Sequence, residues 1–133
     1  MRLETDRVTI DSVTADQLRR ELALLNPVDN ARAVLSRSEE VYLQTAVFDN
    51  GFVIEKREGS EAAHFHAVPS HSPLPPTRAE PKRSWFARIF WPSNFLVSAC
   101  AFPQETMFRA FEAYLAGRET DTPLVWRAGF CDR

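Results

Sequence analysis

Alternation of hydrophobic and polar residues in the middle of the chain predicts three antiparallel β-strands. Residues 41–48 are rich in β-branched and aromatic side chains, Asn50-Gly51 is a strong hairpin-turn signal, and residues 52–57 are again strand-like. A second turn at Gly59-Ser60 leads into a third strand over 62–68. We expect these three segments to form a meander at the centre of a sheet.

Helical periodicity occurs on both sides of this meander. Thr14 and Gln17 have the spacing of a capping box, and leucines then recur at helical intervals. Pro103 is suited to the first position of a second helix, whose apolar side chains recur until Gly117 ends it. Residues 29–35 are expected to add a short second turn of helix.

Three more segments have the composition of strands, namely 8–11, 95–102 and 124–126. Together the elements predict an α+β fold with an antiparallel sheet of four to five strands. The meander forms the core of this sheet, and two main helices pack on one of its faces. The 133 residues fit a single domain, 1–133, that contains a Pro-rich loop and an aromatic insertion at about 69–92.

Charge and cysteine content narrow the classes of function. Sixteen basic and eighteen acidic residues leave a formal charge of -2, which argues against general nucleic-acid binding. Residues 1–12 lack the apolar core of a signal peptide, and we expect no transmembrane segment. Cys100 and Cys131 have neither the spacing of a zinc site nor the number expected of a disulfide framework. These features predict a cytoplasmic protein with both thiols reduced.

The few glycines argue against several enzyme classes. Of the four in the chain, Gly51, Gly59 and Gly117 are used by two turns and a helix end, which leaves none for a phosphate-binding loop. The sequence has no dinucleotide-binding fingerprint, no P-loop and no nucleophile elbow. We therefore expect a binding role rather than catalysis, with no catalytic residue, no resident metal and no cofactor.

The meander supplies the first candidate binding surface. If both turns are two-residue loops, counting inward places Val47, Ile54 and Phe65 on the face toward the core. The opposite face then carries five polar side chains, Gln44, Glu55, Arg57, His64 and His66. Neighbours on one sheet face are close enough to pair, so Glu55 and His64 are expected to form a hydrogen-bonded pair.

This polar face has three interpretations. It can be a binding face on which Glu55 and His64 orient a ligand or act as a base. It can also be an ordinary solvated face with a cross-strand ion pair, which is the commoner arrangement in antiparallel sheets. His64 and His66 also have the spacing of a metal chelate, for which Glu55 or His71 could supply the third ligand, although no sequence signal requires either.

The second candidate surface is the basic and aromatic segment 78–91, whose amphipathic run at 83–91 contains Trp85, Arg88 and Trp91. Trp and Arg are enriched at protein-binding hot spots, so this run is a candidate partner surface. It can also be a lid whose rings pack on the sheet while the basic groups reach water. A membrane-surface helix is the least favoured interpretation, because nine residues are short for membrane binding.

The layout of the chain resembles small uncharacterised bacterial α+β proteins, including toxin-neutralising immunity proteins. The resemblance covers VYLQTAVFDNGFVIEKREGSEAAHFHAV at 41–68, FRAFEAYLAG at 108–117, and the tail that contains Trp126. It concerns the order of hairpin, third strand and helix rather than a diagnostic motif, so it carries over no functional residue. It implies a protein partner and no catalysis.

These observations predict a non-catalytic protein-interaction module, of the kind represented by toxin-immunity proteins of bacteria. The alternative is a protein that binds a small molecule or metal, or a minor enzyme, at the polar face around Glu55, His64 and His66. The sequence indicates neither the identity of a partner nor an oligomeric state.

Overall fold

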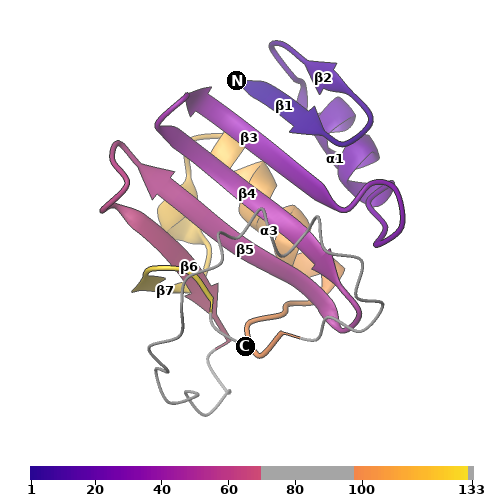
Figure 1. Ribbon diagram of the computed structural model, residues 1–133. Helices are drawn as coiled ribbons and strands as arrows, with labels where there is room; N and C mark the ends of the chain where they lie inside the picture. The colour runs from indigo at the N-terminus through magenta and orange to yellow at the C-terminus, as the bar shows by residue number, and fades with distance from the viewer. Residues whose placement is uncertain (70–97, 132–133) are drawn as a thin grey trace.

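The protein contains one antiparallel sheet of seven strands and two α-helices (Figure 1). A computed structural model describes residues 1–69 and 98–131. The strands lie in the order β2-β1-β3-β4-β5-β6-β7 across the sheet. Their bounds are β1 Arg2–Thr5, β2 Thr9–Ile10, β3 Arg32–Ser38, β4 Val41–Phe48, β5 Gly51–Glu58, β6 His64–Val68 and β7 Val125–Ala128. The helices are α1 Ala15–Ala23 and α3 Gln104–Leu115, and a 3-10 turn, η1, spans Glu119–Asp121.

The predicted α+β class and antiparallel sheet are confirmed, but the predicted four to five strands are too few. Strand β1 was missed because it has only four residues. Residues 32–38 form strand β3 where a turn of helix was expected over 29–35. This segment pairs with β1 on one side and β4 on the other, so sheet pairing outweighs its weak local preference.

Both helices lie on the same face of the sheet, as predicted (Figure 1). Leu18 and Leu22 of α1 and Phe111 of α3 pack with Leu43 and Ile54 of the sheet in one large hydrophobic core. Phe111 is fully buried. Both predicted helices are confirmed, and Pro103 lies one position earlier than expected, at the N-cap of α3. No helix in the described ranges is long and apolar enough to cross a lipid bilayer.

The predicted capping box at the start of α1 is confirmed. The Thr14 hydroxyl accepts a hydrogen bond from the backbone N–H of Gln17 at 3.2 Å. The Gln17 side-chain oxygen in turn accepts one from the backbone N–H of Thr14 at 2.9 Å. Two backbone donors that the helix leaves unpaired are therefore satisfied by side chains.

We expect Thr14→Ala to lower the free energy of unfolding by about 1 kcal/mol, because the Gln17 N–H loses its acceptor. Urea denaturation measures this change. Thr14→Ser keeps the hydroxyl and is the matched control, so it should remain close to the wild type. A Thr14→Ala protein with unchanged stability would show that the box does not stabilise α1.

The register of the meander differs from the one obtained by counting. The β4–β5 turn is formed by Asp49-Asn50, and Gly51 already pairs with Phe48. The β5–β6 turn is also longer than two residues, since the Glu58 N–H donates to the Ala63 carbonyl at 2.9 Å. Each strand pair is displaced by two residues. An even displacement leaves every side chain on its predicted face.

Gly51 is needed for a close approach to another segment rather than for the turn. The N–H of Phe52 donates to the carbonyl of Phe102 at 2.9 Å, and the reverse bond is 2.8 Å. A Cβ atom on Gly51, whose φ is +141°, would collide with the Phe102 carbonyl oxygen. The fourth strand predicted over 95–102 is therefore wrong in its described part, 98–102, which forms a turn and one isolated bridge. Residues 95–97 lie outside the described ranges.

Candidate functional site

The five polar residues predicted for one sheet face do share that face, opposite the helices. Gln44 comes from β4, Glu55 and Arg57 from β5, and His64 and His66 from β6. Glu55 pairs in register with Gln44 on one side and with His66 on the other, and Arg57 pairs with His64. Glu55 and His64 are therefore diagonal neighbours on this face and do not lie directly opposite each other.

Glu55 is the centre of a buried hydrogen-bond network. Its Oε2 lies 2.9 Å from Nε2 of His64, which reaches it diagonally, and 3.3 Å from Nε2 of Gln44. Its Oε1 accepts a bond from the backbone N–H of Cys131 at 3.4 Å. The predicted Glu55–His64 pair therefore forms, and it joins the sheet to the C-terminal segment.

The face around this network is buried, so the interpretation as an ordinary solvated face is wrong here. Gln44 and Glu55 are both 0% exposed, and His64 and His66 are 6% and 8% exposed. The segment 129–131, which we call the C-terminal tail, packs against them. The ring of Phe130 stacks on His64 at 4.0 Å, and His66 Nδ1 donates to the Gly129 carbonyl at 2.8 Å.

Burial raises the pKa of Glu55, because removal from water disfavours the charged carboxylate. The bond to His64, the charge of His64, the Cys131 N–H and the Gln44 amide act in the opposite direction and only partly offset it. The folded state therefore holds the Glu55 proton more tightly than the unfolded chain does.

This shift predicts how stability changes with pH. Because the native state binds more protons than the unfolded state, the stability that Glu55 contributes is lost as pH rises from the ordinary pKa of this carboxyl, 4.5, through its raised value. The Glu55→Gln variant has no titrating group at this position, and both proteins keep His64 and His66. The difference in stability between the two proteins therefore reports the titration of Glu55. Urea denaturation from pH 4 to pH 8 should therefore show the wild type losing stability relative to Glu55→Gln, by at most about 1.4 kcal/mol per pH unit. A relative gain with rising pH would show that pairing with His64 outweighs burial.

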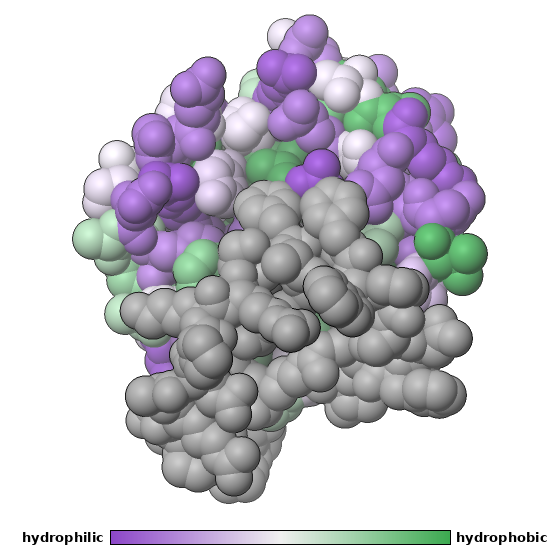
Figure 2. Space-filling view, viewed as in Figure 1, coloured by the Kyte–Doolittle hydropathy of each residue, from purple (hydrophilic) through white to green (hydrophobic). Residues whose placement is uncertain are grey.

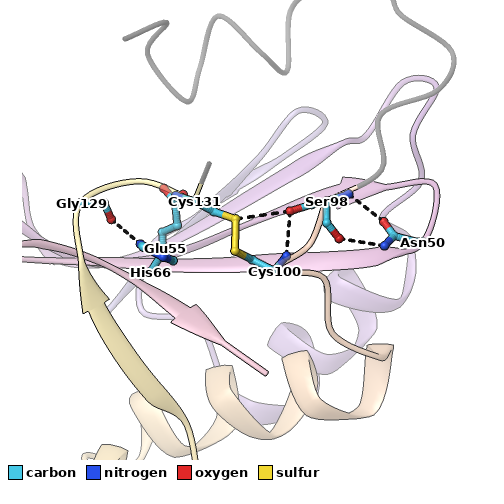
Figure 3. The surroundings of a disulfide bond; sticks show 7 residues. All are labelled: Asn50, Glu55, His66, Ser98, Cys100, Gly129 and Cys131. Atoms are coloured by element: carbon cyan, nitrogen blue, oxygen red, sulfur yellow. Dashed lines mark hydrogen bonds between the residues drawn. A yellow bond between two sulfur atoms is a disulfide. The ribbon is translucent and has the colours of Figure 1, made fainter. Parts of the chain in front are cut away.

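A disulfide bond between Cys100 and Cys131 holds the tail in place (Figure 3). Both residues are 4% exposed. The expectation of two reduced thiols is therefore wrong. The sequence could not indicate the bond, because the two cysteines are 31 residues apart and are brought together only by the sheet.

The partner of the tail in this bond is the segment 98–102, which is anchored on the β4–β5 hairpin. The Asn50 side chain donates to the Ser98 carbonyl at 2.8 Å and accepts from the Ser98 N–H at 3.1 Å. The Ser98 hydroxyl accepts from the Cys100 N–H at 3.1 Å and lies 3.4 Å from Cys131 Sγ (Figure 3). Ser98 therefore links the turn, the disulfide and the tail.

A second, smaller hydrophobic core surrounds the disulfide on this face. It consists of Ala46, Phe48, Val53, Val68, Cys100 and Cys131. The sheet is thus covered on both faces in this region. This explains why β4 is buried almost continuously over 43–46, without the alternation of a strand that is solvated on one side.

An open groove begins where this cover ends, on the same face of the sheet. We call it the polar groove, and its volume is about 650 Å³. Its lining residues come from β1, β3, β4 and β5 and from the segments next to them, and are Met1, Arg2, Glu4, Asp11, Ser12, Arg32, Val34, Ser36, Arg37, Ser38, Glu39, Tyr42, Gln44 and Arg57. Figure 2 shows that hydrophilic side chains cover much of the visible part of this face.

Two buried polar atoms of groove-lining residues have no hydrogen-bond partner within residues 1–69 and 98–131. They are Oε1 of Gln44, an acceptor, and Nε of Arg57, a donor, and both are buried. Gln44 and Arg57 are diagonal neighbours, since Gln44 pairs with Glu55 and Tyr42 pairs with Arg57. Buried polar atoms are nearly always paired in proteins, so each unpaired one requires an explanation.

Ion pairs hold the arginines around the groove in place. Arg57 is 2.7 Å from Glu40, Arg37 is 2.6 Å from Glu119 and Arg2 is 3.3 Å from Glu4. Hydrogen bonding to Tyr42 also raises the pKa of Arg57, so this guanidinium remains charged. The groove therefore presents positive groups in defined positions.

The histidines do not form a metal chelate with Glu55 in this arrangement. His66 donates to the Gly129 carbonyl, while His64 faces Glu55. Across residues 1–69 and 98–131, which do not include His71, no three potential ligands among His, Cys, Asp and Glu lie close enough to hold a metal ion.

Several functional candidates were not identified from the sequence. The tail and Ser98 gave no signal, because their contacts with Glu55 and Asn50 depend on tertiary structure. Tyr42 could have been found, since it alternates with Gln44 in a predicted strand. Trp85, Arg88 and Trp91 lie outside the described residues, so the second predicted surface stays a prediction.

Comparison with known proteins found no protein-family model, no curated protein and no solved structure that matches this chain.

Proposed function

We propose that the protein is a non-catalytic protein-interaction module that binds its partner in the polar groove. The observation that carries this proposal is the pair of buried atoms of groove-lining residues, Gln44 Oε1 and Arg57 Nε, that have no partner in the described part of the chain. Leaving such an atom unpaired costs about 1–3 kcal/mol. A partner that supplies one donor and one acceptor would recover this free energy once a shift of the side chains uncovers the two atoms.

The shape and composition of the groove favour a macromolecular partner. It crosses β1 to β5, is lined mainly by polar side chains, and includes four arginines and Tyr42. Arg and Tyr are among the residues that contribute most at protein interfaces, and they lose little entropy when ion pairs and packing already hold them. A protruding polar segment of another protein fits these features.

The Glu55 network supports binding rather than catalysis. Glu55 and His64 lie beneath the C-terminal tail, where they bond to each other, to Gln44 and to Cys131. Gln44 Nε2 is held by Glu55, which orients Gln44 Oε1 for a partner. We therefore assign Glu55 and His64 a positioning role.

A toxin-neutralising bacterial protein is the more specific form of this proposal. It rests on the resemblance in layout over 41–68 and 108–117 and on the absence of the common catalytic motifs. Under this form, the partner is a protein that inhibits growth when it is produced alone.

The disulfide favours an oxidising compartment as the place of action, because such bonds persist there and are rare in the cytosol of most organisms. The predicted cytoplasmic location stays untested. Alkylation of intact cells, followed by mass spectrometry of the peptides containing Cys100 and Cys131, distinguishes the two locations. Alkylated thiols would support the cytoplasm, and an unreacted disulfide would support the oxidising compartment.

Quantitative affinity purification from the native organism tests the interaction. We expect a stoichiometric partner that Arg57→Ala retains at least roughly tenfold less well, as for a hot-spot residue. Arg20→Ala, which removes an exposed arginine on the helix face, is the matched control. A Trp85→Ala/Trp91→Ala variant tests the other predicted surface separately. Retention that depends on Trp85 and Trp91 but not on Arg57 would contradict binding in the groove.

Growth assays test the specific form of the proposal. The captured partner is produced in bacteria alone and together with wild-type protein or Arg57→Ala. Rescue by the wild type and not by Arg57→Ala is the expected result. A partner that does not inhibit growth would overturn the immunity role and leave the interaction module intact.

A further inference from the structure

A second cavity lies away from the polar groove, between α3 and the residues that precede β7. We call it the lateral cavity, and its volume is about 570 Å³. Cavities of about 300–1,000 Å³ are typical of small-molecule sites. The lining residues are Val68, Pro69, Phe102, Thr106, Arg109, Glu112, Ala113, Arg118, Asp121, Thr122, Pro123 and Leu124.

The inner wall of the lateral cavity is apolar. Val68 at the end of β6 and Phe102 before α3 are 8% and 7% exposed, and Leu124 packs against the main core. Ala113 on α3 contributes only a methyl group, which leaves space next to the helix. This wall suits a hydrocarbon chain or a small ring, because transfer of apolar surface from water into such a site is favourable.

Charged groups also line this cavity, and their pairing leaves an excess of positive charge. Glu112 is bound by Arg19, so its charge is already compensated. Arg109 has only a distant contact, 3.8 Å, with the exposed Glu105. Within the described ranges, neither Arg118 nor Asp121 takes part in an ion pair. Two arginines therefore face one uncompensated carboxylate, that of Asp121.

We propose that the lateral cavity binds a small amphipathic carboxylate, with its apolar body against Val68, Phe102 and Leu124 and its anionic head at Arg109 and Arg118. Guanidinium groups bind carboxylates through charge-assisted, often bidentate, hydrogen bonds. This site is separate from the polar groove, because the two have no lining residue in common. The proposal of a ligand site in the lateral cavity therefore does not depend on the proposed partner of the polar groove.

Three probes with the same eight-carbon chain separate the head group from the chain. Octanoate, octan-1-ol and octylamine are titrated into the full-length protein, and the methyl resonances of Val68, Ala113 and Leu124 are followed by NMR. We expect octanoate to shift these resonances and to bind at least about tenfold more tightly than octanol. Equal affinities for octanoate and octanol, or tighter binding of octylamine, would overturn the anionic part of the proposal.

Two variants test the location. Arg118→Gln should weaken octanoate binding about tenfold without changing the affinity for octanol, because only the head group loses a partner. Ala113→Leu fills the cavity on a helical face and should abolish binding of both. Arg20→Gln on α1 is the matched control for loss of an exposed arginine and should bind as the wild type does. No methyl shifts with millimolar octanoate, or unchanged binding in Ala113→Leu, would remove the site.

Discussion

Cys131→Ser is expected to lower the free energy of unfolding by about 3–4 kcal/mol, the value for closing a loop of this length. The bond encloses α3, η1 and β7, and it holds the tail against Glu55 and His64. Its loss gives the unfolded chain more freedom and removes a covalent tether from the second core. Urea denaturation under non-reducing conditions measures the change.

Three comparisons show whether the bond itself is responsible. Cys100→Ser should have the same effect, and the double variant should be no less stable than either single one, because all three lack the same bond. Wild-type protein treated with a dithiol should reach a similar stability. A Cys131→Ser protein as stable as the oxidised wild type would contradict a stabilising disulfide.

Glu55→Ala is expected to cost at least about 3 kcal/mol, because three buried hydrogen-bond partners each lose their acceptor at about 1–3 kcal/mol. The change removes the acceptor for the Gln44 amide, the His64 ring and the Cys131 N–H at once. These groups are buried and would remain without a partner. Thermal and urea unfolding should both detect the effect.

Two other substitutions control for the removal of a carboxylate. Glu61→Ala removes an exposed carboxylate in the turn after β5 and should stay within about 0.5 kcal/mol of the wild type. Glu55→Gln keeps the shape and part of the bonding, so it should cost less than Glu55→Ala. If Glu55→Ala and Glu61→Ala were equally stable, the network would not contribute to stability.

Loss of the disulfide and loss of the Glu55 carboxylate should both also affect partner binding, because both change the surroundings of Gln44. Glu55 holds the amide of Gln44, which lines the polar groove, and the tail keeps Glu55 out of water. Variants that release the tail or remove the carboxylate should therefore weaken partner binding, even though neither residue lines the groove.

Much of the fold was accessible from sequence patterns, because those patterns are local. The capping box at Thr14 and Gln17, the helix after Pro103 and the alternation through β4 and β5 each depend on residues close together in the chain. The strand pairings differ from the predicted ones by two residues, and an even difference keeps each side chain on its predicted face of the sheet.

The remaining features could not be predicted, because they depend on contacts between distant segments. Asn50-Gly51 has the sequence of a hairpin turn, but Gly51 is required because a side chain there would collide with the backbone of Phe102. Strand β3 is defined by its neighbours on both sides. The burial of Glu55 and His64 depends on the tail, whose position depends on Cys100 far away in the sequence.

The proposed function requires a partner that binds in the polar groove at Gln44 and Arg57. The most direct test is an NMR titration of isotope-labelled protein with the partner recovered by affinity purification, following the Arg57 Nε–H and the Gln44 side-chain amide. Binding in the groove predicts that both signals change with partner concentration, while the backbone amides of Leu22 in α1 and Phe111 in α3, in the core on the helix side, stay unchanged. Changes at α1 or α3 with the Arg57 and Gln44 signals unaffected would contradict it.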